Sequence, residues 1–322
     1  MKTYIIRRFL YAIPLLLAIS LFSFLIMQLS PGNYLDQLRM NPDISTEVLN
    51  TMERDFGLDR SVPEQYALWL GQVLRGNLGR SFAYRVPVTQ VIGSRIMNTL
   101  ILSFAAMVLA WGASIPIGIY SATNKYTIGD NVFTSLAFVG LSIPNFFFAL
   151  LLLYGIVTLN LDWPIQGMTS ITHGMMSPTE QIIDILKHLV VPAVVLGTAS
   201  MAGLTRQMRG QMIDAMTSDY VRTARSKGLM ERVVVYKHAL RNAINPMITI
   251  FGFQISALLG GAALTEIVTG WPGLGTLMLN AVRSKDLYLA MAGLMMGSIL
   301  LITGNLIADI LLAISDPRIR YN

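Results

Sequence analysis

The sequence contains no cysteine among its 322 residues and only three histidines. The absence of cysteine excludes disulfide bonds, thiolate metal sites and cysteine nucleophiles. Charged residues make up 13% of the chain, against about 25% in an average soluble domain, whereas hydrophobic residues make up 53%. This imbalance is typical of a protein with several membrane-spanning helices. The net charge of +6 is therefore expected at the cytoplasmic face of a membrane, and no nucleic-acid partner is expected.

Several motifs that carry chemistry are also missing. The chain has no GxxxxGK[ST] phosphate loop, so it is not expected to bind or hydrolyse ATP itself, and it has neither HExxH nor GxSxG. His173, His188 and His238 are scattered along the chain, which favours structural roles over metal binding. The long apolar stretches carry no ionisable residue at their centres, where proton-coupled transporters normally keep carboxylates. We therefore expect no catalytic residue, no metal site and no cofactor in this chain.

Six stretches are near or above the length of about 20 apolar residues that a membrane-spanning helix needs. The first runs from Phe9 to Leu35, with its apolar part ending near Leu29, and the others lie between Arg95 and Lys125, Asp130 and Asp162, Lys187 and Arg206, Arg241 and Glu266, and Asp286 and Asp309. We expect an all-α membrane protein with six transmembrane helices. The predicted parts are a first helix (residues 1–29), a helical cap outside the membrane (30–95) and a five-helix core (96–322) that includes a cytoplasmic loop (206–246). The first stretch is expected to remain as a helix, because it is longer than a signal-peptide core and no small-residue cleavage site follows it.

The distribution of lysine and arginine predicts the orientation of these helices. Lys2, Arg7 and Arg8 precede the first stretch, and an even number of helices returns the C-terminus, with Arg318 and Arg320, to the same side. The connection from 206 to 241 carries eight basic and three acidic residues, whereas the connection from 163 to 186 has no lysine or arginine. Both termini and the basic connection are therefore expected in the cytoplasm.

The cap contains two sequence signals for short helices. Ser45 precedes an amphipathic stretch that Gly57 ends, and Ser61-Val62-Pro63-Glu64 is a capping box with proline in the first turn of a second helix. Gly76 and Gly79 end this second helix. Two interpretations remain open for the cap: a compact layer that only packs on the transmembrane helices, or a platform that receives a soluble partner or shapes the entrance.

The segment from Asp219 to Pro246 has the most informative pattern in the chain. Asp219 is predicted to cap a short helix that runs to Ser226, and Gly228 allows a tight turn with positive φ. A second amphipathic helix follows, and Pro246 is expected to end it before the fifth transmembrane stretch. On physical grounds alone, a basic amphipathic segment is more often a helix at the membrane surface than a part that docks into a protein.

The sequence DYVRTARSKGL, from Asp219 to Leu229, resembles the EAA loop of ABC-importer permeases. Arg222, Thr223, Ala224 and Gly228 fall on its E-A-A-x-x-x-G positions, with Arg222 and Thr223 replacing the glutamate and the first alanine, as in the branch that handles peptides and nickel. The resemblance extends over essentially the whole chain: 7–32, 56–70, 76–82, 238–246, 264–277 and 316–320 are each similar to a family segment. The sequence is thus identified as a member of the B-type permeases of dipeptide, oligopeptide and nickel ABC importers.

The resemblance implies a type I importer fold in a bacterial inner membrane. Its implied partners are a paralogous second permease subunit, two cytoplasmic ATPase subunits that bind ATP and Mg²⁺, an extracytoplasmic substrate-binding protein and membrane lipid. The loop would seat in the ATPase through Asp219, Tyr220, Arg222, Thr223, Ala224, Lys227, Gly228 and Leu229. Peptides are the expected cargo. Nickel or short oligosaccharides remain alternatives, and an ATPase-independent channel or secondary transporter is the rival function.

Four polar residues in or near the fifth and sixth stretches are predicted to line the pathway, because polar side chains in membrane helices usually face the interior of the bundle. They are Gln254, Ser256, Glu266 and Asn305. A membrane-embedded enzyme would need paired acids or a nucleophile with its base within the transmembrane stretches, and the sequence shows neither.

Overall fold

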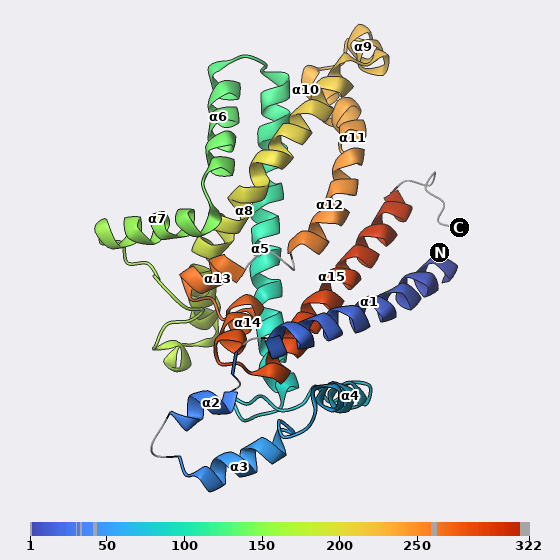
Figure 1. Cartoon of the computed structure of the whole chain (residues 1–322). Helices are drawn as coiled ribbons and strands as arrows, with labels where there is room; N and C mark the ends of the chain where they lie inside the picture. The colour runs from blue at the N-terminus through green and yellow to red at the C-terminus, as the bar shows by residue number, and fades with distance from the viewer. Residues whose placement is uncertain (1, 30, 33, 41–43, 259–262, 316–322) are drawn as a thin grey trace. The chain divides into compact units, whose positions relative to one another are not determined.

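The computed structural model describes residues 2–29, 31–32, 34–40, 44–258 and 263–315, and these residues are predominantly helical (Figure 1). The C-terminal segment 316–320, which carries Arg318 and Arg320, lies outside the described residues. The chain forms two compact units, which are described separately. Unit 1 contains Met1–Asn98 and Pro272–Ile302, and unit 2 contains Thr99–Trp271 and Thr303–Asn322.

Within the described residues, four helices are long and apolar enough to cross a membrane. They are α1 (Lys2–Leu29), α5 (Val88–Thr123), α8 (Pro178–Thr217) and α15 (Leu287–Ser315). They correspond to the first, second, fourth and sixth stretches that the sequence predicts. Helix α8 has 40 residues and so continues well beyond the uncharged stretch between Lys187 and Arg206.

The other two predicted stretches are not single long helices. The third is divided into α6 (Ile128–Ser142) and α7 (Asn145–Thr158) at Pro144, and Ile143 has an extended backbone (φ −92°, ψ 123°). A residue before proline disfavours the helical conformation, which explains why the helix ends here. The fifth stretch contains α12 (Asn245–Leu258), which has 14 residues, and α13 (Ala263–Thr269).

Unit 1 contains the predicted cap helices. They are α3 (Thr46–Asp55) and α4 (Val62–Val73), and α2 (Tyr34–Arg39) precedes them. Both predicted helix starts are confirmed: the Ser45 side chain accepts a hydrogen bond from the amide of Val48 (3.4 Å), and the Glu64 carboxylate accepts bonds from the backbone and side chain of Ser61 (3.1 and 2.9 Å). An apolar core that includes Phe24, Leu35, Trp69, Phe82 and Met291 joins α1, these cap helices and α15.

A buried carboxylate joins the cap to the start of α15. Asp286 has no exposed surface, and its oxygens accept hydrogen bonds from the Ser81 hydroxyl (2.5 Å) and from the amides of Ala83 (3.0 Å) and Leu289 (3.2 Å). Because one of these bonds satisfies an amide in the first turn of α15, Asp286 also acts as the N-cap of that helix. Helix α14 (Leu274–Arg283) lies just before it in the chain.

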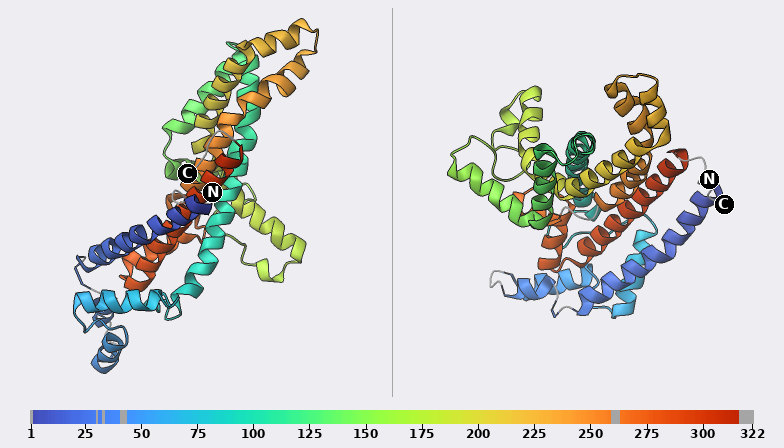
Figure 2. Two further views of the ribbon diagram at one scale, coloured as in Figure 1. Left: turned by 90° about the vertical axis from the view of Figure 1, so that its right-hand side faces the viewer. Right: turned by 90° about the horizontal axis from the view of Figure 1, so that it is seen from above.

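Unit 2 is arranged along α8. Helices α6 and α7 pack against α8, and the chain beyond α8 turns back along it through α9 (Asp219–Ser226), α10 (Glu231–Val233), η2 (Val234–Ala239) and α11 (Leu240–Ala243), as Figure 2 shows. Pro246 lies in the first turn of α12, directly after this returning segment. Helices α5 and α8 also pack closely: a Cβ atom on Gly118 of α5 would lie 2.6 Å from the Cβ of Met208 on α8.

Candidate functional site

Residues 219–246, called the basic segment below, begin with an ordered helix start. Ser218 has an extended backbone (φ −73°, ψ 152°) and is the N-cap of α9. The prediction that Asp219 is the cap is therefore wrong by one residue. Asp219 lies instead in the first turn of α9, where its negative charge interacts favourably with the helix dipole. The predicted extent of the helix, from Asp219 to Ser226, is confirmed.

The inner face of α9 is fixed to α8 by apolar packing. Val221 has no exposed surface and Ala224 is 4% exposed. Both belong to a buried cluster that includes Met208 and Met212 near the end of α8 and Val234 in the returning segment. Close-packed side chains transmit displacement because the interior has few voids. A force on α9 therefore reaches α8 directly.

The turn after α9 is set by a glycine. Gly228 has φ +72°, and its amide donates a hydrogen bond to the carbonyl of Arg225 (2.9 Å). Side chains closing the turn add an ion pair, in which Nε and Nη2 of Arg225 lie 3.1 and 2.6 Å from the two carboxylate oxygens of Glu231. The hydrogen bonds from Arg225 hold the pKa of the Glu231 carboxyl below its usual value. A backbone hydrogen bond closes the turn after α9, and the Arg225–Glu231 ion pair holds the end of α9 to the start of α10.

The chain then forms a π-helix, η2, which the sequence does not predict. A π-helix accommodates an extra residue in a turn and is found frequently at functional sites. Here it places Val234, Val235 and Ala239 in the buried cluster with α8. The amphipathic helix expected after Gly228 is therefore not a regular α-helix from Val234 to Ala239.

The outer face of the basic segment is open to solvent. Tyr220 and Leu229 are each 40% exposed and Met230 is 74% exposed. Of the eight residues that the sequence predicts for coupling, seven are exposed (Asp219, Tyr220, Arg222, Thr223, Lys227, Gly228 and Leu229), and Ala224 is buried. A surface that combines exposed apolar and basic side chains on a short, firmly packed helix and the turn after it is suited to contact with another protein.

An ion pair joins α8 to the start of α6 close to the basic segment. Arg209 donates two hydrogen bonds to Asp130, from Nε to Oδ1 (3.0 Å) and from Nη2 to Oδ2 (2.9 Å). The Asp130 side chain is 3% exposed and that of Arg209 is 28% exposed. The amide of Tyr126 also donates to Asp130 (3.0 Å). This paired geometry fixes the direction of both side chains and hence the position of α6 on α8.

The four residues predicted to line the pathway are in different surroundings. Gln254 accepts a hydrogen bond from the indole nitrogen of Trp111 (2.5 Å). Glu266 is fully buried within unit 2 and accepts a bond from the Thr99 hydroxyl (2.7 Å). Asn305 is partly buried on α15, and the side chain of Ser256 lies outside the described residues. Their role in the pathway remains a prediction.

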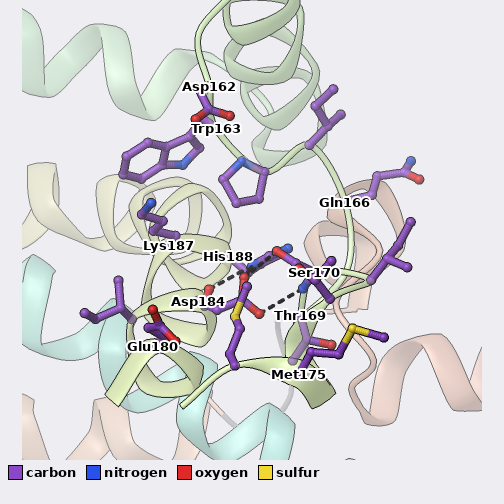
Figure 3. A pocket seen from close by; sticks show the side chains of 16 residues that line it. Asp162, Trp163, Gln166, Thr169, Ser170, Met175, Glu180, Asp184, Lys187 and His188 are labelled. Atoms are coloured by element: carbon purple, nitrogen blue, oxygen red, sulfur yellow. Dashed lines mark hydrogen bonds and ion pairs between the residues drawn. The ribbon is translucent and has the colours of Figure 1, made fainter. Parts of the chain in front are cut away.

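At the other end of α8, residues 159–177 fold into an ordered loop, called the distal loop. Asp184 of α8 holds this loop in place: its carboxylate accepts hydrogen bonds from the amide and hydroxyl of Ser170 (2.9 and 2.5 Å; Figure 3). The same carboxylate lies 2.8 Å from Nδ1 of His173. Nδ1 of His188 lies 3.3 Å from the same carboxylate. Two of the three histidines, His173 and His188, thus meet at one carboxylate although they lie apart in the sequence. The spacing of four residues between Asp184 and His188 places both side chains on one face of a helix. This part of the cluster can therefore be found from the sequence.

The distal loop and the first turns of α8 border an open hollow of about 690 Å³. The hollow, called the distal hollow, has polar and apolar walls that include Asp162, Trp163, Glu180 and Lys187 (Figure 3). Among the described residues, no group of three or more histidine, aspartate or glutamate side chains is arranged to hold a metal ion.

Comparison with known families covers nearly the whole chain. Residues 114–321 match the family described as binding-protein-dependent transport system inner membrane component, and residues 1–103 match its N-terminal domain. The chain belongs to this family. It is a membrane-embedded permease component of a transport system that depends on a binding protein, and not the ATPase of that system.

Curated relatives of this permease align with it from end to end. The oligopeptide transport system permease protein AppB of Bacillus subtilis is 43% identical over 323 residues, which cover 100% of both chains. The dipeptide transport system permease protein DppB of Escherichia coli K12 is 32% identical over 340 residues, which cover 100% of this chain and 99% of that one. The glutathione transport system permease protein GsiC of Pectobacterium atrosepticum is 36% identical, with 100% of both chains covered.

Proposed function

We propose that this permease is the membrane-spanning subunit of an ATP-driven importer of peptides, and that its basic segment receives the movement of a cytoplasmic ATPase. One observation carries the coupling role. Helix α9 is fixed to α8 through the buried residues Val221 and Ala224 but presents Tyr220 to solvent, and the turn after α9 exposes Leu229 and Met230. A part that transmits force needs both a rigid attachment and an accessible face, and the basic segment combines them.

The same proposal sets the orientation and the partners. With the basic segment in the cytoplasm, both termini are cytoplasmic and the cap lies outside the membrane. Six membrane-spanning segments follow if α6–α7 and α12–α13, which are short or broken, also cross the bilayer within the assembled transporter. The partners would be a paralogous second permease, two ATPases that hold ATP and Mg²⁺, and an external binding protein. Closure of the ATPases would push α9 and tilt α8 between inward- and outward-open states.

The proposed cargo rests on the relatives. Two of those described above are oligopeptide and dipeptide permeases, and the chain matches them over its full length. Peptides are therefore the cargo that we propose, in preference to nickel or short oligosaccharides. Uptake of labelled di- and oligopeptides, with nickel measured in parallel, in cells that lack and then regain the chain tests this choice. Uptake of nickel alone would reject peptides as the cargo.

Substitution of Gly228 by proline tests the coupling role. Proline fixes φ near −65° and lacks an amide hydrogen, whereas Gly228 has φ +72° and donates to Arg225. The change is therefore incompatible with the turn, and we expect Gly228→Pro to abolish ATP-dependent uptake and co-purification of the ATPase while membrane insertion is retained. Normal uptake by this variant would contradict the coupling role.

The chain offers a closely matched control for this experiment. Gly76 has φ +79°, its amide donates to the carbonyl of Val73 (2.9 Å), and no atom lies within 4 Å of its Cβ position, as at Gly228. Because Gly76 is in the cap, Gly76→Pro disturbs a turn of the same geometry away from the basic segment. We expect this variant to retain the ATPase. Loss of the ATPase in both variants would show that general misfolding, and not the basic segment, explains the result.

A further inference from the structure

The distal hollow contains two opposite charges that the protein itself does not neutralise. Within the part of the chain that the structure describes, neither the Asp162 carboxylate nor the Lys187 ammonium has a hydrogen-bond or ion-pair partner, although both line the hollow (Figure 3). The remaining acids of the hollow are already used. Asp184 holds Ser170 and His173, as described above, and Glu180 accepts hydrogen bonds from the amide and hydroxyl of Ser177 (2.8 and 2.9 Å).

These bonds make the hollow a formed site and not a gap between flexible chains. The Ser177–Glu180 pair caps α8, and Asp184 fixes the backbone of the distal loop opposite it. The hollow measures about 690 Å³, within the usual range of about 300–1,000 Å³ for small-molecule sites. Trp163, which is 36% exposed, adds an aromatic wall.

We propose that the distal hollow transiently binds the charged ends of a short peptide, with Asp162 holding its ammonium group and Lys187 its carboxylate. The two charges match a molecule that carries both signs, and a single anion or cation would leave one of them unpaired. The flexible side chains of Met175 and Met176 and the ring of Trp163 accept side chains of varied shape. Recognition would therefore depend on the peptide ends and not on the sequence between them.

The location of the hollow agrees with this role. It borders the first turns of α8 as far as His188, and the basic segment follows the end of α8 at Thr217, so about 44 Å of helix separates them, at 1.5 Å for each of 29 residues. This separation is comparable to the thickness of a bilayer, about 40–45 Å with its headgroups. The inference rests on the proposed function, because with the basic segment in the cytoplasm the hollow opens on the opposite side, where peptide arrives.

Direct binding to the purified permease–ATPase complex in nanodiscs, without binding protein, tests the proposal. The probes are trialanine, N-acetyl-trialanine, trialanine amide and the doubly blocked peptide. We expect each blocked end to weaken binding to the wild type by up to about fivefold, the limit for an exposed ion pair. Asp162→Asn should remove the preference for a free ammonium only, and Lys187→Gln the preference for a free carboxylate only.

Charge-conserving variants provide the control. Asp162→Glu and Lys187→Arg should keep both preferences, which separates loss of charge from loss of fold. Equal binding of all four probes by the wild type would overturn the proposal. The proposal would also be overturned if Asp162→Asn and Lys187→Gln kept the preferences for free peptide ends but weakened retention of the binding protein. That result would identify the hollow as a protein-docking site.

A separate arm distinguishes this inference from the proposed function. ATP-dependent uptake of trialanine by the wild-type complex is measured with binding protein present. Absence of uptake would overturn the peptide-import function and this inference together. Uptake without selective binding of the peptide ends would overturn the inference alone.

Discussion

The ion pair between Asp130 and Arg209 should make a large contribution to the stability of unit 2. Asp130 is almost completely shielded from water, and Arg209 supplies two of its hydrogen bonds. Removing one partner of a buried pair costs about 3–5 kcal/mol, because the other charge stays buried without compensation. We expect Arg209→Ala to cost about 3 kcal/mol, at the lower end of that range. Arg209 is 28% exposed, and the amide of Tyr126 still donates to Asp130.

The expected loss of stability corresponds to a measurable change in melting temperature. For a domain of 150–250 residues, 1 kcal/mol lowers the melting temperature by about 2–4 °C, so Arg209→Ala should melt about 6–12 °C below the wild type. The assay is the loss of folded, monodisperse permease on heating in detergent. A double-mutant cycle of Asp130→Asn and Arg209→Gln isolates the pair, because the double variant should cost clearly less than the sum of the single variants.

The result that would refute this reasoning is specific. Additive costs in the cycle, or an Arg209→Ala variant that melts at the wild-type temperature, would show that α6 is held on α8 by apolar packing alone. The conservative variant Arg209→Lys gives a further check. Lysine keeps the charge but not the paired geometry, so its melting temperature should lie between those of the alanine variant and the wild type.

Two further changes test other contacts that hold the fold together. Asp286→Ala removes the acceptor of two backbone amides and the Ser81 hydroxyl, so it should lower the free energy of unfolding by about 2–3 kcal/mol. It should also speed proteolysis within residues 30–95, and unchanged cleavage would argue against the anchoring role of Asp286. Gly118→Ala places a Cβ 2.6 Å from Met208 and should cost about 1–3 kcal/mol in thermal melting. Gly112→Ala on the same helix has free space at its Cβ and should be neutral; equal effects of the two would refute the packing argument.

The sequence predicts most of the local helix signals correctly. Ser45 and the Ser61–Glu64 box start helices at the expected residues, because capping depends only on neighbours three residues apart. The long uncharged stretches likewise predict α1, α5, α8 and α15. The third stretch is divided into two helices because Pro144 disfavours the helical conformation at Ile143, an effect that is local and readable from the sequence.

The parts of the site that depend on distant residues are not readable in this way. The buried status of Val221 and Ala224 depends on the methionines of α8, and the meeting of His173 with Asp184 depends on how the distal loop folds back. The π-helix η2 is likewise a consequence of packing, because its extra residue brings Val234 and Ala239 onto α8. No pattern of hydrophobic spacing encodes such a local change of helix type.

The proposed coupling requires that α8 transmit displacement along its length, and Pro192 makes this a specific question. Proline removes one backbone hydrogen bond within the helix, so Pro192 divides α8 into two parts, called the first rod (before Pro192) and the second rod (after it). Met208 and Arg209 belong to the second rod, which the basic segment follows, whereas Asp184 and Lys187 belong to the first. Displacement of α9 therefore moves the second rod first, and α6 moves with it because the Asp130–Arg209 pair joins the two helices. The displacement reaches the distal hollow only afterwards, through the first rod. This order implies that breaking the Asp130–Arg209 pair uncouples ATP hydrolysis from uptake more strongly than it weakens peptide binding at the hollow.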